Sequence, residues 1–355
     1  ITKKIDASIE NIFIRARVNG DAKNDTCWLD NVFIAWSPNN YDKPKKIKNR
    51  ILTSKFLNSD ESLEVPISML EYTRHKSDKI SSNQFNARLI FDSKKINNRF
   101  MLHRDAWQRI KDNGEAIKTL PRFSIGFVQY KNNLIPIEKS FEPGKHPYWE
   151  ITFQNGITWK EESDGNWSRA SAPFSIQERA ANCTHNGVMT WLFNEDKHIS
   201  RVAYQISSET CAYFKFDMWG TLKAETAEIN FNEQDIKKLI SRYRKNLKAR
   251  FTVASLSDLN AKYKNINIEN LSIGDGISPV DLSVYGLVVD GKHYRSNCNT
   301  RHGLYPFCDE MALPSYSTAK SIYAGVGLMH LESIRPGIGK NNISEIIKEC
   351  NKKSW

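Results

Sequence analysis

A serine and a lysine stand three residues apart near the end of the chain, at Ser317 and Lys320. A serine hydroxyl is a weak nucleophile at neutral pH and needs a neighbouring base to take its proton. A lysine amine can be that base when burial or a cationic neighbour lowers its pKa. Residues i and i+3 of a helix share a face, so this spacing brings the amine within reach of the hydroxyl. The pair therefore indicates nucleophilic acyl transfer.

A helix beginning at the serine would be needed to position this pair. Pro314 stands just before that point, as is common at a helix start. Free N–H groups and the positive end of the helix dipole would then face the hydroxyl, where they stabilise a developing oxyanion. Gly325 and Gly327 predict close packing against a neighbouring element. Apolar residues at roughly the helical period predict a helix buried along most of its length: Ala319, Ile322, Tyr323, Val326 and Met329.

The segment Ser-Thr-Ala-Lys-Ser at 317–321, with Ser315 before it and an apolar helix after it, resembles the nucleophile segment of the serine β-lactamase and penicillin-binding-protein superfamily. It is most similar to the class C and esterase-like branch. The stretch SVYGLVVDGKHYRSNC resembles the strands that precede the nucleophile helix there. The resemblance covers about residues 281–355 and implies the beginning of a β-lactamase-like α/β catalytic domain. It implies a serine hydrolase that acylates Ser317 with help from Lys320, acts on an ester, amide or peptide-like substrate, and needs no cofactor.

The other signatures of that superfamily are missing after Lys320. They are Tyr-x-Asn or Ser-x-Asn, and Lys-Thr-Gly or His-x-Gly on a strand. The triplet Arg301-His302-Gly303 is similar to the last of these but precedes the serine, so we assign it to a loop between Cys298 and Cys308. Three explanations stay open: a polypeptide cut after Trp355 whose remainder is a second chain, a truncated sequence, or a fortuitous resemblance. The substrate expected is a small molecule or a component of the cell envelope.

The six cysteines of the chain suggest disulfides. None belongs to a Cys-x-x-Cys pair, so zinc ribbons and dithiol redox motifs are unsupported. Cys298 and Cys308 bracket a short loop, and Cys183 and Cys211 flank a strand-rich region, so each pair is a candidate bridge. Bridges predict an oxidising compartment, periplasmic or secreted, with a signal peptide already removed. The alternative is a cytosolic chain whose cysteines are unpaired and buried.

Along the chain, signals typical of strands give way to signals typical of helices. The fold class expected is therefore α+β. Residues 1–230 contain many short strand signals, which predict an antiparallel accessory module, a sandwich or barrel-like. Residues 231–280 predict an amphipathic helix and a linker, before the catalytic segment at 281–355. Asn155-Gly156 and Asp290-Gly291 each predict a tight hairpin. The strand signals include residues 12–18, 28–36, 122–130 and 148–160, and a short helix is expected around 104–111.

The helix predicted after Asn232 has an apolar stripe and a basic face. A basic face can bind phosphate, and the formal net charge of +11 would suit a nucleic-acid partner. The basic residues are scattered through the chain, however, so we favour a solvated face over nucleic acid. No apolar run reaches about 18 residues, so no transmembrane helix is predicted. The stripe is Ile236, Leu239, Ile240, Tyr243 and Leu247, and the basic residues are Lys237, Lys238, Arg242, Arg244, Lys245 and Lys248.

Aromatic residues offer a different function, carbohydrate or envelope binding by the β-rich module without catalysis. Exposed tryptophans can stack on sugar rings, whereas tryptophans at strand spacing are more often part of a core. The interpretation as core is favoured here. The residues concerned are Trp149, Trp159, Trp167, Trp191 and Trp219.

Overall fold

The computed structural model of the protein describes residues 12–13, 50–75, 78–141, 144–179, 181–264 and 282–347. The chain divides into two compact units. The first comprises Ile1–Ile14 and Ile34–Pro314, and the second comprises Arg15–Phe33 and Ser315–Trp355. The strand predicted at 28–36, most of the linker, Cys27 and Cys350 lie outside the described residues. The boundaries proposed at residues 230 and 280 stay predictions.

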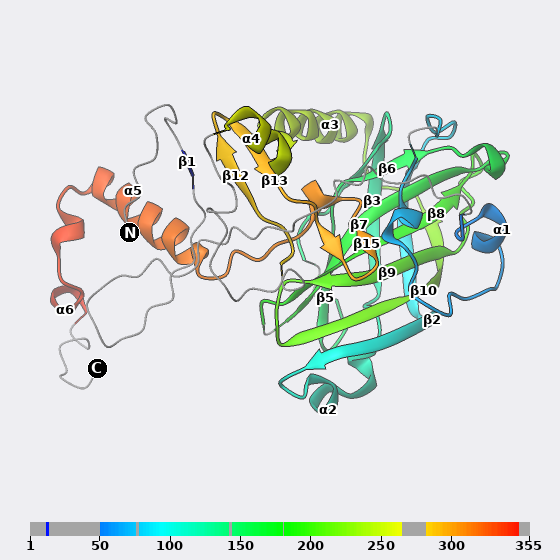
Figure 1. Ribbon diagram of the computed structural model, residues 1–355, viewed down its shortest axis with the longest axis horizontal. Helices are drawn as coiled ribbons and strands as arrows, with labels where there is room; N and C mark the ends of the chain where they lie inside the picture. Colours follow the sequence, from blue (N-terminus) through cyan, green and yellow to red (C-terminus); the bar gives the residue numbers. More distant parts are fainter. Residues whose placement is uncertain are drawn as a thin grey trace. The chain divides into compact units, whose positions relative to one another are not determined.

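The core of the first unit is one nine-stranded antiparallel sheet that closes on itself (Figure 1). Its ring runs β2, β3, β4, β6, β7, β8, β9 and β10, and β10 returns to pair with β2, while β5 pairs with β7 alone. The antiparallel pairing confirms the predicted antiparallel module. The closure of the sheet agrees with the barrel-like form, one of the two forms predicted for it. Its strands are β2 (Asn86–Asp105), β3 (Phe123–Tyr130), β4 (Asn133–Pro136), β5 (Trp149–Phe153), β6 (Gly156–Trp159), β7 (Ser168–Glu178), β8 (Thr184–Phe193), β9 (Val202–Glu209) and β10 (Phe214–Ala227).

The closed sheet is filled with apolar side chains, many of them aromatic. Alternate residues of each strand contribute, as Phe214, Phe216 and Met218 do on β10. The ring centroid of Trp191 lies 5.6 Å from that of Phe85, within the same cluster. Because side chains occupy the interior, any ligand of this module must bind to its outer surface or its rims.

Four of the five tryptophans considered as sugar platforms are core residues. Trp149, Trp159 and Trp191 are fully buried, and Trp219 is 6 % exposed. Trp167 is half-buried and packs against a cluster on the outside of the sheet. The core interpretation of these residues therefore holds.

The Asn155-Gly156 pair does not form the predicted hairpin. β5 and β6 flank it, but both pair with β7, with Phe153 opposite Phe174 and Ile157 opposite Ser171. They therefore run along β7 as one interrupted strand. A Cβ atom at position 156 would lie 2.1 Å from the Ser171 carbonyl oxygen, so glycine permits a close approach of two backbones here.

The Asp290-Gly291 pair does form the predicted hairpin. Asp290 has φ 49° and Gly291 has φ 69°, the left-handed values that a type I′ turn needs at both central residues. The hairpin joins β12 (Gly286–Val289) to β13 (Lys292–Arg295). These strands belong to a second sheet with β1 (Ile12–Phe13) and β11 (Thr252–Ser255), in which β11 runs parallel to β13.

The predicted amphipathic helix is α3 (Glu233–Lys248), which lies against the outside of the closed sheet (Figure 1). Asn232 caps it by accepting a hydrogen bond from the Asp235 N–H at 2.9 Å. Leu239 and Tyr243 are buried against Val128 and Ile135 of the sheet. The basic face forms ion pairs within the helix, such as Lys237 with Glu233 at 2.6 Å, which agrees with a solvated face.

The remaining elements of the first unit cover the sheet or connect its strands. The helix expected around 104–111 is α2 (Arg109–Asn113), and α4 (Leu256–Lys262) begins after a capping box made by Ser255 and Asp258. Two segments, 50–73 and 298–308, cover the outer face of β8, β9 and β10. The others are α1 (Ser54–Leu57), β14 (Asn299–Thr300), β15 (Gly303–Leu304) and 3₁₀ turns at Met69–Tyr72, Gly114–Lys118, Glu162–Asp164 and Cys308–Glu310.

The second unit contains the helix that follows Ser317, and its apolar residues are not buried. Tyr323 is 81 % exposed and Met329 is 73 % exposed. Cβ atoms added at Gly325 and Gly327 would meet no heavy atom within 4 Å, so the expected close packing is wrong as well. The elements are a π-helix at Lys320–Val326, α5 (Gly327–Ile334), a 3₁₀ turn at Ile338–Lys340 and α6 (Ile343–Ile346). None of the helices formed by the described residues is long and apolar enough to cross a membrane.

Candidate functional site

Ser317 and Lys320 lie at the start of the exposed helix. The Lys320 backbone N–H donates to the Ser317 carbonyl oxygen at 3.0 Å, so the two residues are one turn apart, as their spacing predicts. Both side chains are exposed. Tyr316, immediately before the serine, has φ 45°, an uncommon value for a residue with a side chain. Whether this pair performs acyl transfer stays a prediction.

A second group of functional side chains surrounds Asp217 on the outer face of β10. The Nε2 atoms of His103 and His302 each lie 2.8 Å from Asp217 Oδ2, and Arg301 Nε lies 2.9 Å from Oδ1. Arg301 also makes a bidentate pair with Glu209, at 2.8 Å for each bond. The Asp217 side chain is fully buried, whereas the two imidazoles and the guanidinium are partly exposed.

The charges around Asp217 set its protonation state. Burial alone would raise the pKa of Asp217, but the Arg301 guanidinium and hydrogen bonds from His302 and His103 outweigh it, so the pKa lies below its ordinary value. The ionised carboxylate must accept both hydrogen bonds, so each histidine donates its Nε2–H.

Two local features bring these residues together. On β2, His103 is the extra residue of a bulge, since Arg104 lies opposite Lys215 and Leu102 lies opposite Phe216. Bulges redirect a side chain without ending the strand pairing. Arg301 and His302 lie in the turn between β14 and β15, inside the loop closed by the Cys298–Cys308 disulfide. The predicted assignment of this triplet to that loop is confirmed.

A third group lies at the rim of the closed sheet, where β2 ends and β9 turns into β10. Trp107 is 55 % exposed and stacks on Tyr213 with ring centroids 3.8 Å apart and an interplanar angle of 14°. The Arg109 guanidinium lies 5.1 Å from the Trp107 ring centroid and 5.6 Å from that of Tyr213. We call these three residues the rim platform.

The backbone around the rim platform is held in place from several directions. The Asp105 carboxylate accepts hydrogen bonds from the N–H groups of Arg109 and Ile110 at 2.7 and 3.0 Å. The Ala106 N–H donates to the Tyr213 carbonyl oxygen at 2.8 Å. Gln108, between the tryptophan and the arginine, has φ 53°. Non-glycine residues in such conformations cost free energy and cluster at functional sites.

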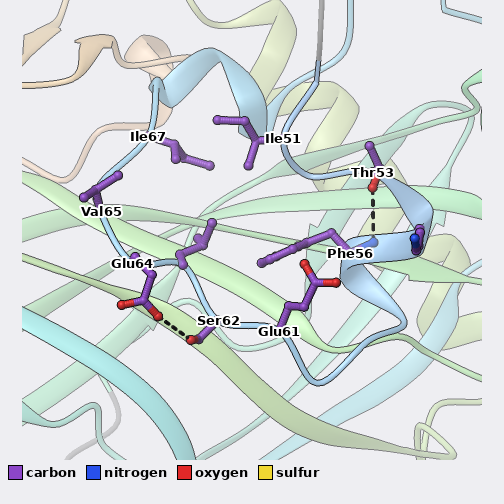
Figure 2. Close-up of a pocket in the computed structure, with 10 residues that line it drawn as sticks. Ile51, Thr53, Phe56, Glu61, Ser62, Glu64, Val65 and Ile67 are labelled. Carbon is purple, nitrogen blue, oxygen red and sulfur yellow. Dashed lines mark hydrogen bonds between the residues drawn. The ribbon is translucent and has the colours of Figure 1, made fainter.

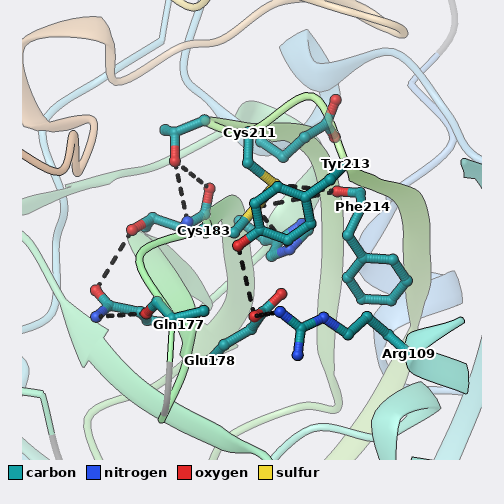
Figure 3. Close-up of a disulfide and its surroundings, with 12 residues drawn as sticks. Arg109, Gln177, Glu178, Cys183, Cys211, Tyr213 and Phe214 are labelled. Carbon is teal, nitrogen blue, oxygen red and sulfur yellow. Dashed lines mark hydrogen bonds and ion pairs between the residues drawn. A yellow bond between two sulfur atoms is a disulfide. The ribbon is translucent and has the colours of Figure 1, made fainter. Parts of the chain in front are cut away.

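Behind the platform lies a buried carboxylate, Glu178. Arg109 is 3.3 Å from Glu178 Oε2, and the Tyr213 hydroxyl donates to the same oxygen at 3.5 Å, as Figure 3 shows. Burial raises the pKa of Glu178 even though Arg109 opposes this effect. A ring stacked on Trp107 would therefore have hydrogen-bonding side chains beside it.

Both predicted disulfides are present. Cys298 is bonded to Cys308, and Cys183 is bonded to Cys211 in the turn that also carries Tyr213 (Figure 3). His185 lies beside the second bridge, fully buried, and burial lowers the pKa of its imidazole to about 3. Disulfides of this kind are typical of extracellular or periplasmic proteins.

The structure also has a shallow pocket, lined by residues of the 51–67 segment (Figure 2). Three of its polar side chains are already engaged: Ser62 donates to Glu64 at 2.9 Å, and Thr53 accepts from the Phe56 N–H at 3.1 Å. Glu64 also pairs with Arg99 at 2.7 Å. The pocket lacks the converging polar groups that would orient a ligand, so we do not assign it a function.

No known protein family matches the chain, and no curated protein and no solved structure shows significant similarity to it.

Sequence reasoning missed the central residues of both first-unit groups. Asp217 and His103 lie on strands more than a hundred residues apart, and Trp107 resembles any other tryptophan in the printed sequence. The triplet Arg301-His302-Gly303 stands out in the sequence only because it is similar to the His-x-Gly motif. The one local signal available was Trp107-Gln108-Arg109 directly after a long strand pattern, where a loop exposes its side chains.

Proposed function

We propose that this chain is a binding protein of an oxidising compartment and that it holds a carbohydrate ring on the rim platform. The observation that carries the proposal is Trp107, which is half exposed while the tryptophans of the closed sheet are buried. Tyr213 supports one face of its indole, and Asp105 fixes the loop that carries it. A rigid exposed aromatic surface of this kind loses little entropy when a ligand stacks on it.

The chemistry beside Trp107 favours a sugar over a purely apolar ligand. A sugar ring has an apolar C–H face and a rim of hydroxyl groups, which need hydrogen-bond partners once water is displaced. Arg109 supplies donors, and the buried Glu178, 3.3 Å from the guanidinium, holds it in place. Apolar surface with a few placed polar groups is the usual composition of a small-molecule site.

A glycan array probed with Trp107→Ala and wild-type protein tests this proposal. Phe251→Ala is the matched control, because Phe251 is an aromatic residue with the same exposed fraction of 55 % in the same unit. We expect the wild type and Phe251→Ala to bind the same glycans and Trp107→Ala to lose at least about fivefold in affinity, on the scale of the roughly 1 to 3 kcal/mol that a nucleobase stacked on an aromatic ring contributes. Equal binding by all three proteins would exclude the platform.

Acyl transfer at Ser317 is a second candidate function. The observation that favours it is the position of Ser317 one helical turn before Lys320. In this proposal Ser317 attacks an ester or amide carbonyl, the Lys320 amine takes the hydroxyl proton, and water later hydrolyses the acyl-enzyme. The closed sheet would then be an accessory module, and a second chain could carry the rest of the catalytic domain.

A serine-reactive phosphonate probe separates this candidate from simple binding. We expect covalent labelling of the wild type and of Ser321→Ala, no labelling of Ser317→Ala, and about a hundredfold slower labelling of Lys320→Met. Ser321→Ala is the control because Ser321 is an exposed serine of the same segment. Labelling that survives in Ser317→Ala would rule the candidate out.

A further inference from the structure

His185 lies beside the Cys183–Cys211 disulfide, and one of its ring nitrogens has no hydrogen-bond partner among the described residues. Its Nε2 atom lies 3.4 Å from Cys183 Sγ, and the residue is fully buried. Within the part of the chain that the structure describes, its Nδ1 atom has no hydrogen-bond partner. Buried polar atoms without partners are rare and point to a function such as ion binding or redox chemistry.

The two sulfur atoms and the imidazole converge on one point. One ligand atom from each of Cys183, His185 and Cys211 lies within 4.8 Å of the other two, and no other group in the described ranges meets this geometry. The imidazole is fixed there because it stacks on Phe216 at 4.2 Å and meets the edge of Trp149 at 5.3 Å. The donor set is therefore preorganised by the core.

We propose that reduction of this disulfide creates a binding site for Zn²⁺, with the thiolates of Cys183 and Cys211 and the imidazole of His185 as ligands. Two thiolates and an imidazole are donors that Zn²⁺ prefers. Three protein ligands leave a fourth tetrahedral position to water. The site is independent of ligand binding at Trp107, and neither proposal needs the other.

The chemical steps balance with a thiol reductant. A small dithiol transfers two electrons and two protons to the bridge, which yields two cysteine thiols and an oxidised cyclic disulfide of the reductant. Binding of Zn²⁺ then releases one proton from each thiol. Cys211 is half-buried in the turn between β9 and β10, whereas Cys183 is buried, so the attacking thiolate reaches Cys211 first.

The test uses the full chain with Cys27 and Cys350 replaced by serine, so that neither can bind metal. The protein is reduced anaerobically with a phosphine, which consumes one water per disulfide, and is titrated with Co²⁺ as a visible probe. We expect about one Co²⁺ per reduced chain, with thiolate charge-transfer absorption that Zn²⁺ abolishes, and no such absorption from the oxidised chain. A reduced, folded chain without this absorption overturns the proposal.

Two variants in the same background identify the ligands. His185→Phe keeps an aromatic ring in the core, and we expect it to weaken Co²⁺ binding at least about tenfold, the size that even an outer-shell change produces. The double variant Cys298→Ser/Cys308→Ser removes the other disulfide and should bind Co²⁺ as the background does. Equal binding by His185→Phe, or loss of binding in the Cys298/Cys308 variant, contradicts the assignment.

Loss of structure on reduction would also be informative. If the near-ultraviolet circular dichroism of the reduced chain collapses, Zn²⁺ is expected to restore it, because a metal that binds only the folded state stabilises that state. A collapsed signal that Zn²⁺ does not restore counts against the site.

Discussion

Asp217 is buried without loss of its charge, because three basic side chains approach it from two segments distant in sequence. His103 comes from a bulge in β2, and Arg301 and His302 come from the disulfide-closed loop. The residue therefore fastens the loop at 298–308 to the sheet. Its polar partners are what make the ionised form more favourable than the neutral one.

Replacing Asp217 with asparagine should change how stability depends on pH. A folded-state pKa below the ordinary value of 3.8 means that the ionised carboxylate stabilises the fold above that value, and that this contribution is lost as the pH falls through the folded pKa. Urea unfolding at pH 7 and at pH 3 should show the loss in the wild type and a smaller change in Asp217→Asn. Asp196→Asn, at an exposed aspartate, should behave as wild type.

At neutral pH the same variant should be less stable than wild type by roughly 1.5 to 3 kcal/mol, because Arg301, His103 and His302 lose the buried carboxylate to which they hydrogen-bond. An unaltered free energy of unfolding would show that the histidines and Arg301 are solvated without Asp217.

A second buried pair offers a sharper test of charge burial. Arg169 and Asp164 have fully buried side chains and form two hydrogen bonds, at 2.7 and 2.9 Å. Asp164→Ala should lower the free energy of unfolding by roughly 3 kcal/mol, since the buried guanidinium then keeps Glu161, at 3.2 Å, but loses its two hydrogen bonds to Asp164. Glu64→Ala breaks the exposed pair with Arg99, and its effect should be close to the detection limit. Similar losses of unfolding free energy for Asp164→Ala and Glu64→Ala would refute the expectation that the buried pair contributes more to stability than the exposed pair.

At the scale of elements, two dipeptides of the same type form different structures. Asp290-Gly291 closes a hairpin because both residues take positive φ values, whereas Asn155-Gly156 continues along β7. Local sequence cannot separate these cases, because the choice depends on β7 pairing with strands on both sides of the dipeptide. Strand positions, α3 and the disulfide partners were predictable from local patterns and spacing. The ring closure and the group around Asp217 were not, because they depend on pairings between distant strands.

Gly156→Ala tests the close approach of the two backbones. The new methyl group would meet the Ser171 carbonyl oxygen at 2.1 Å, so β6 must move away from β7. We expect a loss of about 2 to 3 kcal/mol in the free energy of urea unfolding. Gly126→Ala is the matched control on β3, since its Cβ meets chiefly the mobile end of the Ile137 side chain. Equal losses of unfolding free energy in the two variants would mean that the close backbone approach at Gly156 does not require glycine.

Gly325→Ala should have the opposite effect, because it should stabilise the helix that contains it. The glycine lies in the exposed helix of the second unit, and an added Cβ meets nothing within 4 Å. Alanine is favoured over glycine in a helix interior by about 1 kcal/mol, so helix content by circular dichroism should rise. A fall in helix content would indicate packing against this face.

At the scale of the whole molecule, the disulfide between Cys298 and Cys308 secures a covering segment of the first unit. It spans 10 residues and encloses Arg301 and His302. The double variant Cys298→Ser/Cys308→Ser should lower the free energy of unfolding by roughly 3 kcal/mol, from the loop-closure entropy that the bridge removes in the unfolded chain. Guanidinium unfolding followed by tryptophan fluorescence measures this difference. An unchanged midpoint would show that the ion pairs alone hold the loop.

The order of strands in the closed sheet has a consequence for the time course of folding. Nearly every pairing in the ring joins strands that follow each other along the chain, and such hairpins form within microseconds. The pairing of β2 with β10 is different, because it joins Arg88 to Ala227. That contact must wait for the largest loop to close, and contacts between distant segments slow folding. A ribosome or export channel that has released only the first 200 residues would therefore hold an open meander with unpaired edges at β2 and β8.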